Sequence, residues 1–146
     1  MPKPIPVPDE LSKPFWDAVN QRQLVVQSCT ACNRRQYPPQ PTCAKCGSKD
    51  HLTWLETSGR GRIQGYVVER DTRMEPLVPD QPFNIAVIEL QEDPQILFLS
   101  HLPGVPLGQV PVGARVEVRF DQVAPGQLIH EWQVENSTGG YRPRKK

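Results

Sequence analysis

Apolar and polar residues alternate repeatedly in the second half of the chain, which is the pattern of β-strands with one buried face. The alternation is clearest at residues 114–120, where Val116, Val118 and Phe120 point to one side and charged residues to the other. Residues 85–90 and 96–99 are apolar on both faces, so we expect central strands, or strands whose outer side is covered. Candidate strands cover residues 62–70, 83–90, 95–101, 114–120 and 128–134.

The order of these strands predicts a mainly β-fold. They follow one another with no helical pattern between them, which favours a small, closed, five-stranded barrel of the OB type. An open meander or an SH3-like barrel is the alternative. The link at residues 71–82 is unusually long, which is typical of functional or mobile loops. Glycines at 58–61 precede neither the Gly-Lys-Ser/Thr of a phosphate loop nor a helix, so we expect a bend or bulge there.

The N-terminal part predicts an extended arm, one short helix and a small sheet. Prolines alternate with other residues at 2–8, which favours an extended, polyproline-like arm. Residues 12–22 predict a helix with Ser12 as N-cap, Pro14 in the first turn, and Phe15 and Val19 on one face. A helix this short is unstable alone, so it must dock on its own chain or on another one. Short strands are expected at 24–28, 36–37 and 52–56.

All cysteines of the protein lie in two Cys-x-x-Cys pairs separated by ten residues, namely Cys29, Cys32, Cys43 and Cys46. Two such turns can complete a tetrahedral metal site, so we interpret the stretch as a rubredoxin-like zinc ribbon. With four sulfur ligands no position stays open for water, so the metal is expected to be structural. Disulfides and a redox pair fit the context less well, and iron uses the same ligands. Asn33 and Gly47 follow each pair, where the backbone needs a positive φ.

Composition and charge narrow the functional classes. The chain has 17 prolines and 37% hydrophobic residues, and no apolar run approaches the length of a membrane span, so we expect a soluble, cytoplasmic protein. Without the four basic residues of the tail at 141–146, 13 of the 17 Lys and Arg residues remain against 16 acidic residues. This acidic body disfavours nucleic-acid binding. The predicted organisation is an arm and docking helix at 1–23, a zinc ribbon at 24–57, an OB-fold barrel at 58–136 and a basic tail at 137–146.

With a helix, a ribbon and a barrel in this order, the chain resembles the rubredoxin-like zinc-ribbon plus OB-fold acyl-CoA-associated family. The resemblance runs from residue 8 to about residue 134. Asn33 stands where the family more often has glycine, and asparagine tolerates the same turn. The matching stretches are Pro14–Trp16, Leu24–Gln27, the two cysteine pairs, Tyr37–Pro39, Trp54, Ser58–Gly61 and Val112–Val116.

The resemblance implies a small, non-catalytic accessory subunit. Family members pair with a thiolase-fold enzyme, or with acyl-CoA aldolases or hydratases, and help complete the partner's CoA or acyl channel for C–C bond cleavage or formation. It implies that the four cysteines hold structural Zn²⁺ and that a CoA thioester is the partner's substrate. We expect a heterotetramer with two copies of each chain.

The remaining side chains suggest binding and not catalysis. His51, His101 and His130 are scattered along the chain and no nucleophile motif is present, so we predict no catalytic residue. Partner contacts are expected from apolar residues on projecting segments, namely Ile5, Val7, Phe15, Trp16, Leu77 and Val78.

Two other functions are open at this stage. The first is a single-stranded nucleic-acid-binding module, which would need a basic and aromatic strand face such as Tyr66 with Arg62 and Arg70. The second is a folding or assembly factor that leaves its client. The basic tail could reach the phosphates of CoA or could be a solvated end.

Overall fold

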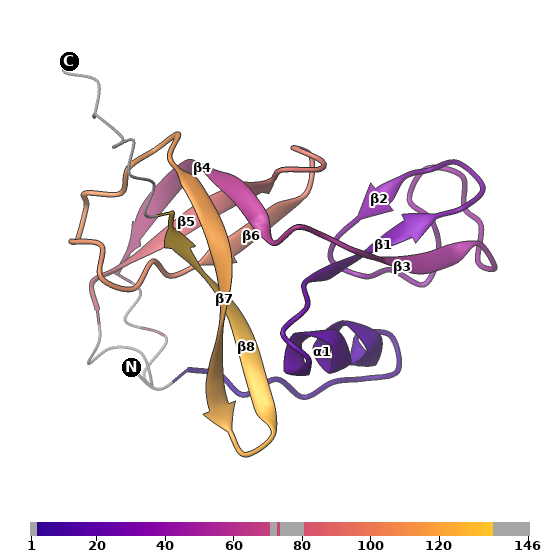
Figure 1. The fold of residues 1–146 in the computed structure, drawn as a ribbon, viewed down its shortest axis with the longest axis horizontal. Helices are drawn as coiled ribbons and strands as arrows, with labels where there is room; N and C mark the ends of the chain where they lie inside the picture. Colours follow the sequence, from indigo (N-terminus) through magenta and orange to yellow (C-terminus); the bar gives the residue numbers. More distant parts are fainter. Residues whose placement is uncertain (1–2, 71–72, 74–80, 136–146) are drawn as a thin grey trace.

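The fold combines one helix with two antiparallel sheets (Figure 1). It is a computed structural model that describes residues 3–70, 73 and 81–135. Most of the predicted link at 71–82, with Leu77 and Val78, lies outside the described residues, as does the predicted basic tail at 137–146. The elements are α1 (Lys13–Asn20), β1 (Val25–Cys29), β2 (Arg35–Gln36), β3 (Leu52–Glu56), β4 (Arg60–Glu69), β5 (Phe83–Leu90), β6 (Leu97–Ser100), β7 (Arg115–Ala124) and β8 (Gln127–Val134).

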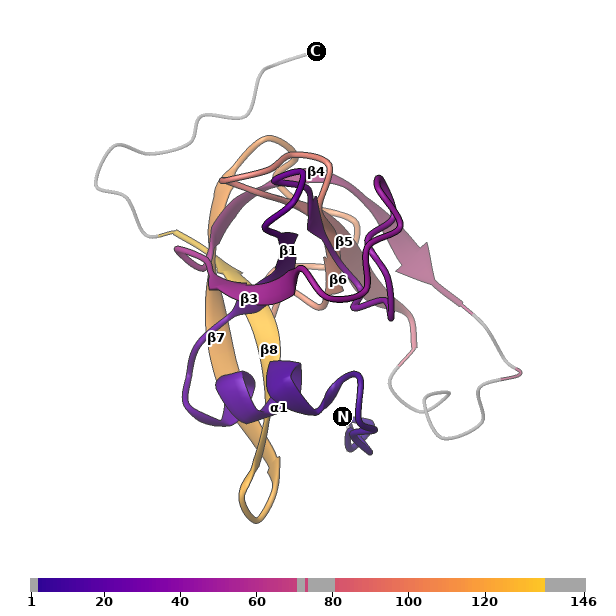
Figure 2. The same cartoon turned by 90° about the vertical axis from the view of Figure 1, so that its right-hand side faces the viewer.

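The smaller sheet has the order β2-β1-β3 and forms the ribbon. Its central strand β1 runs into the first cysteine pair, and Val25 to Cys29 lie opposite Glu56 to Leu52 of β3. In Figure 1 the ribbon lies to one side of the larger sheet, with α1 beneath the ribbon and beside the β7–β8 hairpin, and Figure 2 shows the same arrangement from the ribbon end. The chain passes from one sheet to the other between β3 and β4.

Helix α1 docks on its own chain, which settles the alternative that the sequence left open. Phe15 and Val19 are 2% and 0% exposed, and their burial contributes about 1.5–3 kcal/mol each. Ser12 occupies the N-cap position, but its hydroxyl makes no capping bond and donates instead to Asp9 Oδ1 at 2.7 Å. Asn20 fixes the other end of the helix, since its Oδ1 accepts the Leu128 N–H of β8 at 2.8 Å. Tertiary packing therefore stabilises a helix too short to form alone.

The larger sheet has the order β6-β5-β4-β7-β8. Strand β4 pairs with both β5 and β7, and a bulge between Ile63 and Gly65 bends it. Against expectation, the described strands do not close into a barrel by backbone pairing, because β6 and β8 form no ladder. The Ser100 side chain bridges the gap, because the backbone N–H of Trp132 in β8 donates to Ser100 Oγ of β6 at 3.1 Å. The OB-type strand order is confirmed, but the barrel remains open at this seam.

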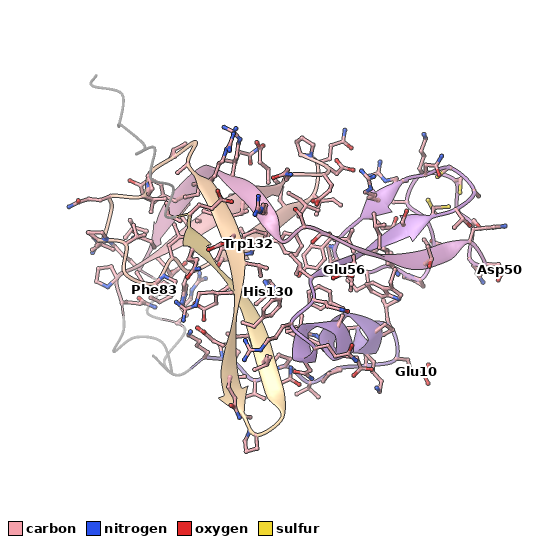
Figure 3. The ribbon with its side chains drawn as sticks, in the orientation of Figure 1. Glu10, Asp50, Glu56, Phe83, His130 and Trp132 are labelled. Atoms are coloured by element: carbon pink, nitrogen blue, oxygen red, sulfur yellow. The ribbon has the colours of Figure 1, made fainter. Side chains whose placement is uncertain are left out.

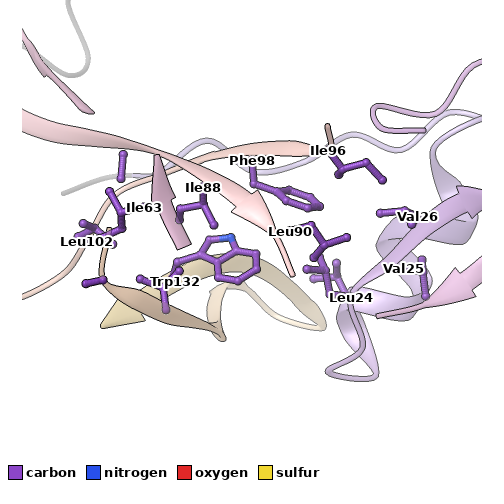
Figure 4. Packing of buried hydrophobic residues seen from close by; sticks show 14 of the residues in the cluster. Leu24, Val25, Val26, Ile63, Ile88, Leu90, Ile96, Phe98, Leu102 and Trp132 are labelled. Carbon is purple, nitrogen blue, oxygen red and sulfur yellow. The ribbon is translucent and has the colours of Figure 1, made fainter. Parts of the chain in front are cut away.

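The hydrophobic core is continuous from the helix and ribbon into the larger sheet (Figure 4). Trp132, Phe98 and Val26 are each 0% exposed and come from β8, β6 and β1. Tyr37, just after β2, reaches Phe98 with ring centroids 4.3 Å apart. The β5–β6 turn is held from the ribbon side, because Arg35 donates to the Glu92 carbonyl at 3.0 Å. The ribbon and the OB sheet thus share one core.

The position of β6 corrects one expectation. The apolar stretch at 96–99 is not central, because β6 forms an edge of the sheet. Its inward residue Phe98 is fully buried, whereas Leu97 and Leu99 are 40% and 66% exposed on the outer side. The described chain therefore leaves the outer side of this strand uncovered.

Candidate functional site

The four cysteine sulfurs meet at the end of the ribbon that lies away from the barrel (Figure 3). All four Sγ atoms lie within 4.8 Å of one another. The Cys29–Cys46 and Cys32–Cys43 sulfur pairs are 3.7 and 3.6 Å apart. Zn–S bonds of about 2.3 Å in a tetrahedron require sulfurs about 3.8 Å apart. The spacing of the four thiols therefore fits a structural zinc ion.

Tight backbone turns present these sulfurs. The Asn33 N–H donates to the Cys29 carbonyl at 2.7 Å, and the Gly47 N–H donates to the Cys43 carbonyl at 2.9 Å. Asn33 and Gly47 have φ values of 61° and 75°, as the sequence predicted. Asparagine and glycine adopt this left-handed conformation at little cost, so the local sequence favours both turns.

Cys43 and Cys32 differ in their thiol pKa. Backbone N–H groups of Cys46 and Lys45 lower the pKa of Cys43 to about 6. For Cys32, the hydrogen bond from the Arg34 backbone favours the thiolate, but burial and the neighbouring thiols outweigh it and raise the pKa to about 11. Four thiolates this close repel one another unless a cation lies between them, which is what a bound zinc ion supplies.

The N-terminal arm lies on the barrel through Lys3. Its ammonium group pairs with Glu131 of β8 and with Asp121 of β7, the latter at 3.2 Å. Burial acts to lower the pKa of Lys3, but the hydrogen bonds to Glu131 and Asp121 outweigh it, and the pKa is raised. Beyond this anchor Ile5 and Val7 are 56% and 92% exposed. The arm thus keeps apolar side chains in solvent while its start is fixed.

The helix residues predicted to touch a partner lie differently. Phe15 is buried in the chain's own core, with ring centroids 5.5 Å from Tyr37 and 5.6 Å from His130. It therefore offers no surface to another molecule in this conformation. Trp16 is half-buried and stacks on His130 at 6.1 Å. Of the six predicted contact residues, Val7 is almost fully exposed, and Ile5 and Trp16 are exposed in part.

A polar cluster that the sequence did not reveal lies at the barrel seam. Lys3, Ser100, His101, His130 and Glu131 line one pocket of about 240 Å³. The hydroxyl of Ser100 donates to the His101 carbonyl at 2.6 Å and accepts from β8. The carboxylate of Glu131 is 4% exposed and binds Lys3. The sequence of the last strand gave no sign that Glu131 is buried, because its partner Lys3 lies in an arm more than a hundred residues away.

The histidines of the seam are neutral near pH 7. Burial lowers the pKa of His130 to about 4, and burial also lowers the pKa of His101. His101 lies beside Phe83 with ring centroids 4.7 Å apart, while His130 packs on Phe98 with ring centroids 5.5 Å apart. His51 is exposed in the ribbon and contacts Ser48 Oγ through Nδ1 at 2.6 Å. These side chains serve packing and local hydrogen bonding.

Two of the residues named for the nucleic-acid alternative, Tyr66 and Arg62, do not share a face of β4. Tyr66 lies opposite Ala86, which is 0% exposed, and its hydroxyl donates to the Gly108 carbonyl at 2.7 Å. Arg62 precedes the bulge and is exposed on the outer side. The aromatic ring and the guanidinium therefore lie on opposite faces of the sheet.

No helix in the described part of the chain is long and apolar enough to span a membrane.

Two family models match the chain in succession. The ChsH2 rubredoxin-like zinc ribbon domain matches residues 16–51, and the ChsH2 C-terminal OB-fold domain matches residues 54–121. A chain of a structure described as an Ltp2-ChsH2(DUF35) aldolase is similar with a TM-score of 0.72 and 26% identity, over 88% of this chain and 98% of that one. A DUF35-family protein of Sulfolobus solfataricus shares the fold, with a TM-score of 0.58 and 20% identity over 86% of each chain.

Curated relatives agree with this match. A probable enoyl-CoA hydratase alpha subunit of Thermomonospora curvata is 32% identical over 114 residues, which are 76% of this chain and 34% of the relative. The chain thus spans about a third of that relative's length. A DUF35 domain-containing scaffold protein of Methanothermobacter thermautotrophicus is 28% identical over 109 residues, or 74% of this chain and 80% of the relative. With both domain models matched in order, the chain belongs to the ChsH2 (DUF35) family of zinc-ribbon and OB-fold proteins.

Proposed function

We propose that this chain is a zinc-containing accessory subunit of an acyl-CoA enzyme complex whose partner carries the catalytic residues. One observation carries the proposal: the chain matches nearly the whole of the DUF35 chain in a structure described as an aldolase complex. The hydratase relative supports the same substrate class, a CoA thioester. The likeness therefore favours an aldolase or hydratase complex as the coarse assignment.

Within this assignment we propose a thiolase-type partner that makes or cleaves a C–C bond. The accessory chain supports the partner's fold and completes its CoA or acyl channel, in a heterotetramer with two copies of each chain. The exposed apolar arm supports such docking, since full burial would gain about 1.5–3 kcal/mol for Val7 and roughly half of that for Ile5, before association costs. Trp16 and the predicted Leu77 and Val78 are proposed to extend this contact.

The zinc ion is proposed to stabilise the ribbon. Cys29, Cys32, Cys43 and Cys46 would hold it, and the ion would supply structure and no reacting group, because sulfur fills all its positions. A ribbon of this size has little core of its own, and the cysteine turns lie at its far end from the core that it shares with the larger sheet. Elemental analysis of the purified chain is expected to give one zinc per chain, and Cys43→Ser is expected to lose it. Iron in its place, or a folded chain without metal, would contradict this part.

The seam supports a binding function more than a catalytic one. Its serine, lysine and carboxylate groups are engaged with one another and with the backbone, and its histidines are neutral by burial. A general acid or base needs a titrating group near pH 7 that can reach a substrate. We therefore expect the purified chain to leave CoA thioesters unchanged.

Purification of the tagged chain from its native cells tests the proposal. The expected result is stoichiometric recovery of a thiolase-type enzyme, a mass of two copies of each chain, and acyl-CoA turnover by the complex. An aldolase or hydratase of another lineage would overturn only the thiolase assignment. Thioester turnover by the chain alone, or recovery only as a free monomer, would overturn the accessory function. Salt-sensitive binding of single-stranded RNA or DNA would favour the nucleic-acid alternative.

A further inference from the structure

The outer side of β4, β5 and β6 forms a continuous apolar face. The strand register places Val67 opposite Ile85, and Val87 opposite Leu99 in the next row. Leu97 extends the face along β6. Leu99 and Val67 are 66% and 56% exposed, while Ile85 and Val87 lie half-buried between them. We call these five side chains the outer face.

This face is unusual for a sheet edge. Protein sheets normally protect an edge strand with charges, bulges or proline, whereas β6 carries leucines at both outward positions. Contiguous exposed apolar side chains with a polar border commonly mark a binding surface. Burial alternates along β5 and β6, and their inward residues, such as Ile88 and Phe98, fill the core. The side chains of the outer face therefore do not contribute to that core.

A row of charges borders the outer face on one side. In the register, Leu97 lies opposite Glu89, Glu89 opposite Arg62, and Arg62 opposite Arg115. Like charges directly opposite one another on neighbouring strands destabilise a sheet. Among the residues that the structure describes, neither the Arg62 nor the Arg115 guanidinium has an ion pair or a hydrogen bond. Arg62 thus has Glu89 on one side and Arg115 on the other, and the Arg115 side of this row favours a further negatively charged group from outside the chain.

The hollow beside this row indicates which kind of anion fits. Arg60, Arg62 and Arg115 line a depression of about 520 Å³ together with Glu89 and Glu135. Glu135 lies 4.0 Å from Arg60. Two carboxylates in the hollow disfavour a phosphate dianion, because like charges repel at short range. Single carboxylates on a protein surface can approach the arginines and avoid the glutamates.

The outer face also adjoins the N-terminal arm. Pro4 lines one pocket together with Ile85, Leu99 and Ile129. Ile5, which is 56% exposed, follows directly after this contact. A partner seated on the arm would therefore reach the outer face without a break in the contact surface.

We propose that the outer face binds the acyl-CoA enzyme subunit of the complex, through an apolar ridge of that subunit flanked by carboxylates that pair with Arg62 and Arg115. This inference rests on the proposed function and names the surface that performs it. The apolar rows supply the buried area, and the arginine pair orients the partner, since desolvated charge pairs contribute to specificity. Leu99, as the most exposed of the five, is expected to be an anchor of the contact.

Binding of matched variants to the enzyme subunit recovered with the wild-type chain tests the inference. Leu99→Asp and Val67→Asp are each expected to weaken the complex about 30-fold or more, as for interface anchors. Arg62→Glu should weaken it about tenfold and reduce its salt dependence. Leu55→Asp is the control, because Leu55 is also exposed, at 36%, but lies on β3 of the ribbon. Circular dichroism and zinc content identify any variant that fails to fold.

The outcomes separate this inference from the proposed function. If the wild-type chain recovers no acyl-CoA enzyme, the proposed function fails. If it recovers the enzyme and the face variants bind as well as Leu55→Asp does, the outer-face inference alone fails. A wild-type homodimer in sedimentation analysis that Leu99→Asp converts to a monomer would also overturn it, since a second copy would then occupy the face. A photo-crosslinker in place of Leu99, expected to label an acidic partner peptide, covers the case of a misfolded variant.

Discussion

Replacing Phe15 by alanine tests whether the helix belongs to the chain's own core. The ring is 2% exposed and contacts Trp16, Tyr37 and His130 with centroids 5.1, 5.5 and 5.6 Å away. It thereby joins the helix, the ribbon and the barrel. If Phe15 served only a partner, as the sequence suggested, its removal would leave the isolated chain as stable as before.

The structure predicts a large loss of stability. Truncation of a buried phenylalanine to alanine costs about 3–5 kcal/mol, through lost transfer free energy and the cavity left behind. The contacts here come from three separate elements, which restricts collapse of the cavity, so we expect about 4 kcal/mol. For a chain of this size that corresponds to a fall in Tm of about 8–16 °C.

Urea and thermal unfolding of Phe15→Ala, each followed by tryptophan fluorescence and circular dichroism at saturating zinc, measure this loss. Val7→Ala is the matched control, because Val7 is apolar and 92% exposed, and its free energy of unfolding should match that of the wild type. A loss below about 1 kcal/mol for Phe15→Ala would refute the reasoning, since no fully buried phenylalanine in a tight core is that dispensable.

Three further predictions concern the seam. The pKa of His130 is about 4 in the folded chain and about 6.5 in the unfolded chain, so its contribution to the free energy of unfolding is fully present above pH 6.5 and falls by about 3 kcal/mol toward pH 4. His130→Phe should flatten that part of the wild-type profile of unfolding free energy against pH. Lys3→Met should cost about 2 kcal/mol by leaving buried Glu131 unpaired, and adding Glu131→Gln should recover most of it in chemical unfolding; equal loss in both variants would contradict this. Ser100→Ala should cost about 1–3 kcal/mol by depriving the buried Trp132 N–H of its acceptor, with faster hydrogen exchange at that amide; unchanged exchange would contradict the bridge.

Local patterns in the sequence predicted most of the elements and the metal site. The cysteine spacing requires both pairs to reach one point, so the four sulfurs could be assigned without a fold. Period-two alternation located β7, and an apolar run with both faces apolar located β5. Such signals come from residues that are close in sequence, so they can be read without knowledge of the tertiary structure.

Contacts between distant segments could not be predicted in the same way. Phe15 has the same local pattern whether it packs inside the chain or on a partner, and only the position of β8 decides. Burial of Glu131 depends on Lys3, 128 residues away in sequence. The open seam likewise lies between distant segments, since its bridging residues Ser100 and Trp132 are 32 residues apart in sequence. The sequence showed that the outer side of β6 is apolar, but not that this side stays uncovered by the residues that the structure describes.

The grip of the ribbon on the β5–β6 turn has a mechanical consequence. Glu92 accepts from Arg35 through its carbonyl and from the Ser58 N–H through its carboxylate, and Tyr37 rests on Phe98. Removing the metal would make the ribbon more mobile. Because these contacts join the ribbon to the β5–β6 turn, the added motion would reach β6, the strand that bears Leu97 and Leu99. A metal ion held only by cysteines would thus tune the shape of a surface to which it contributes no atom.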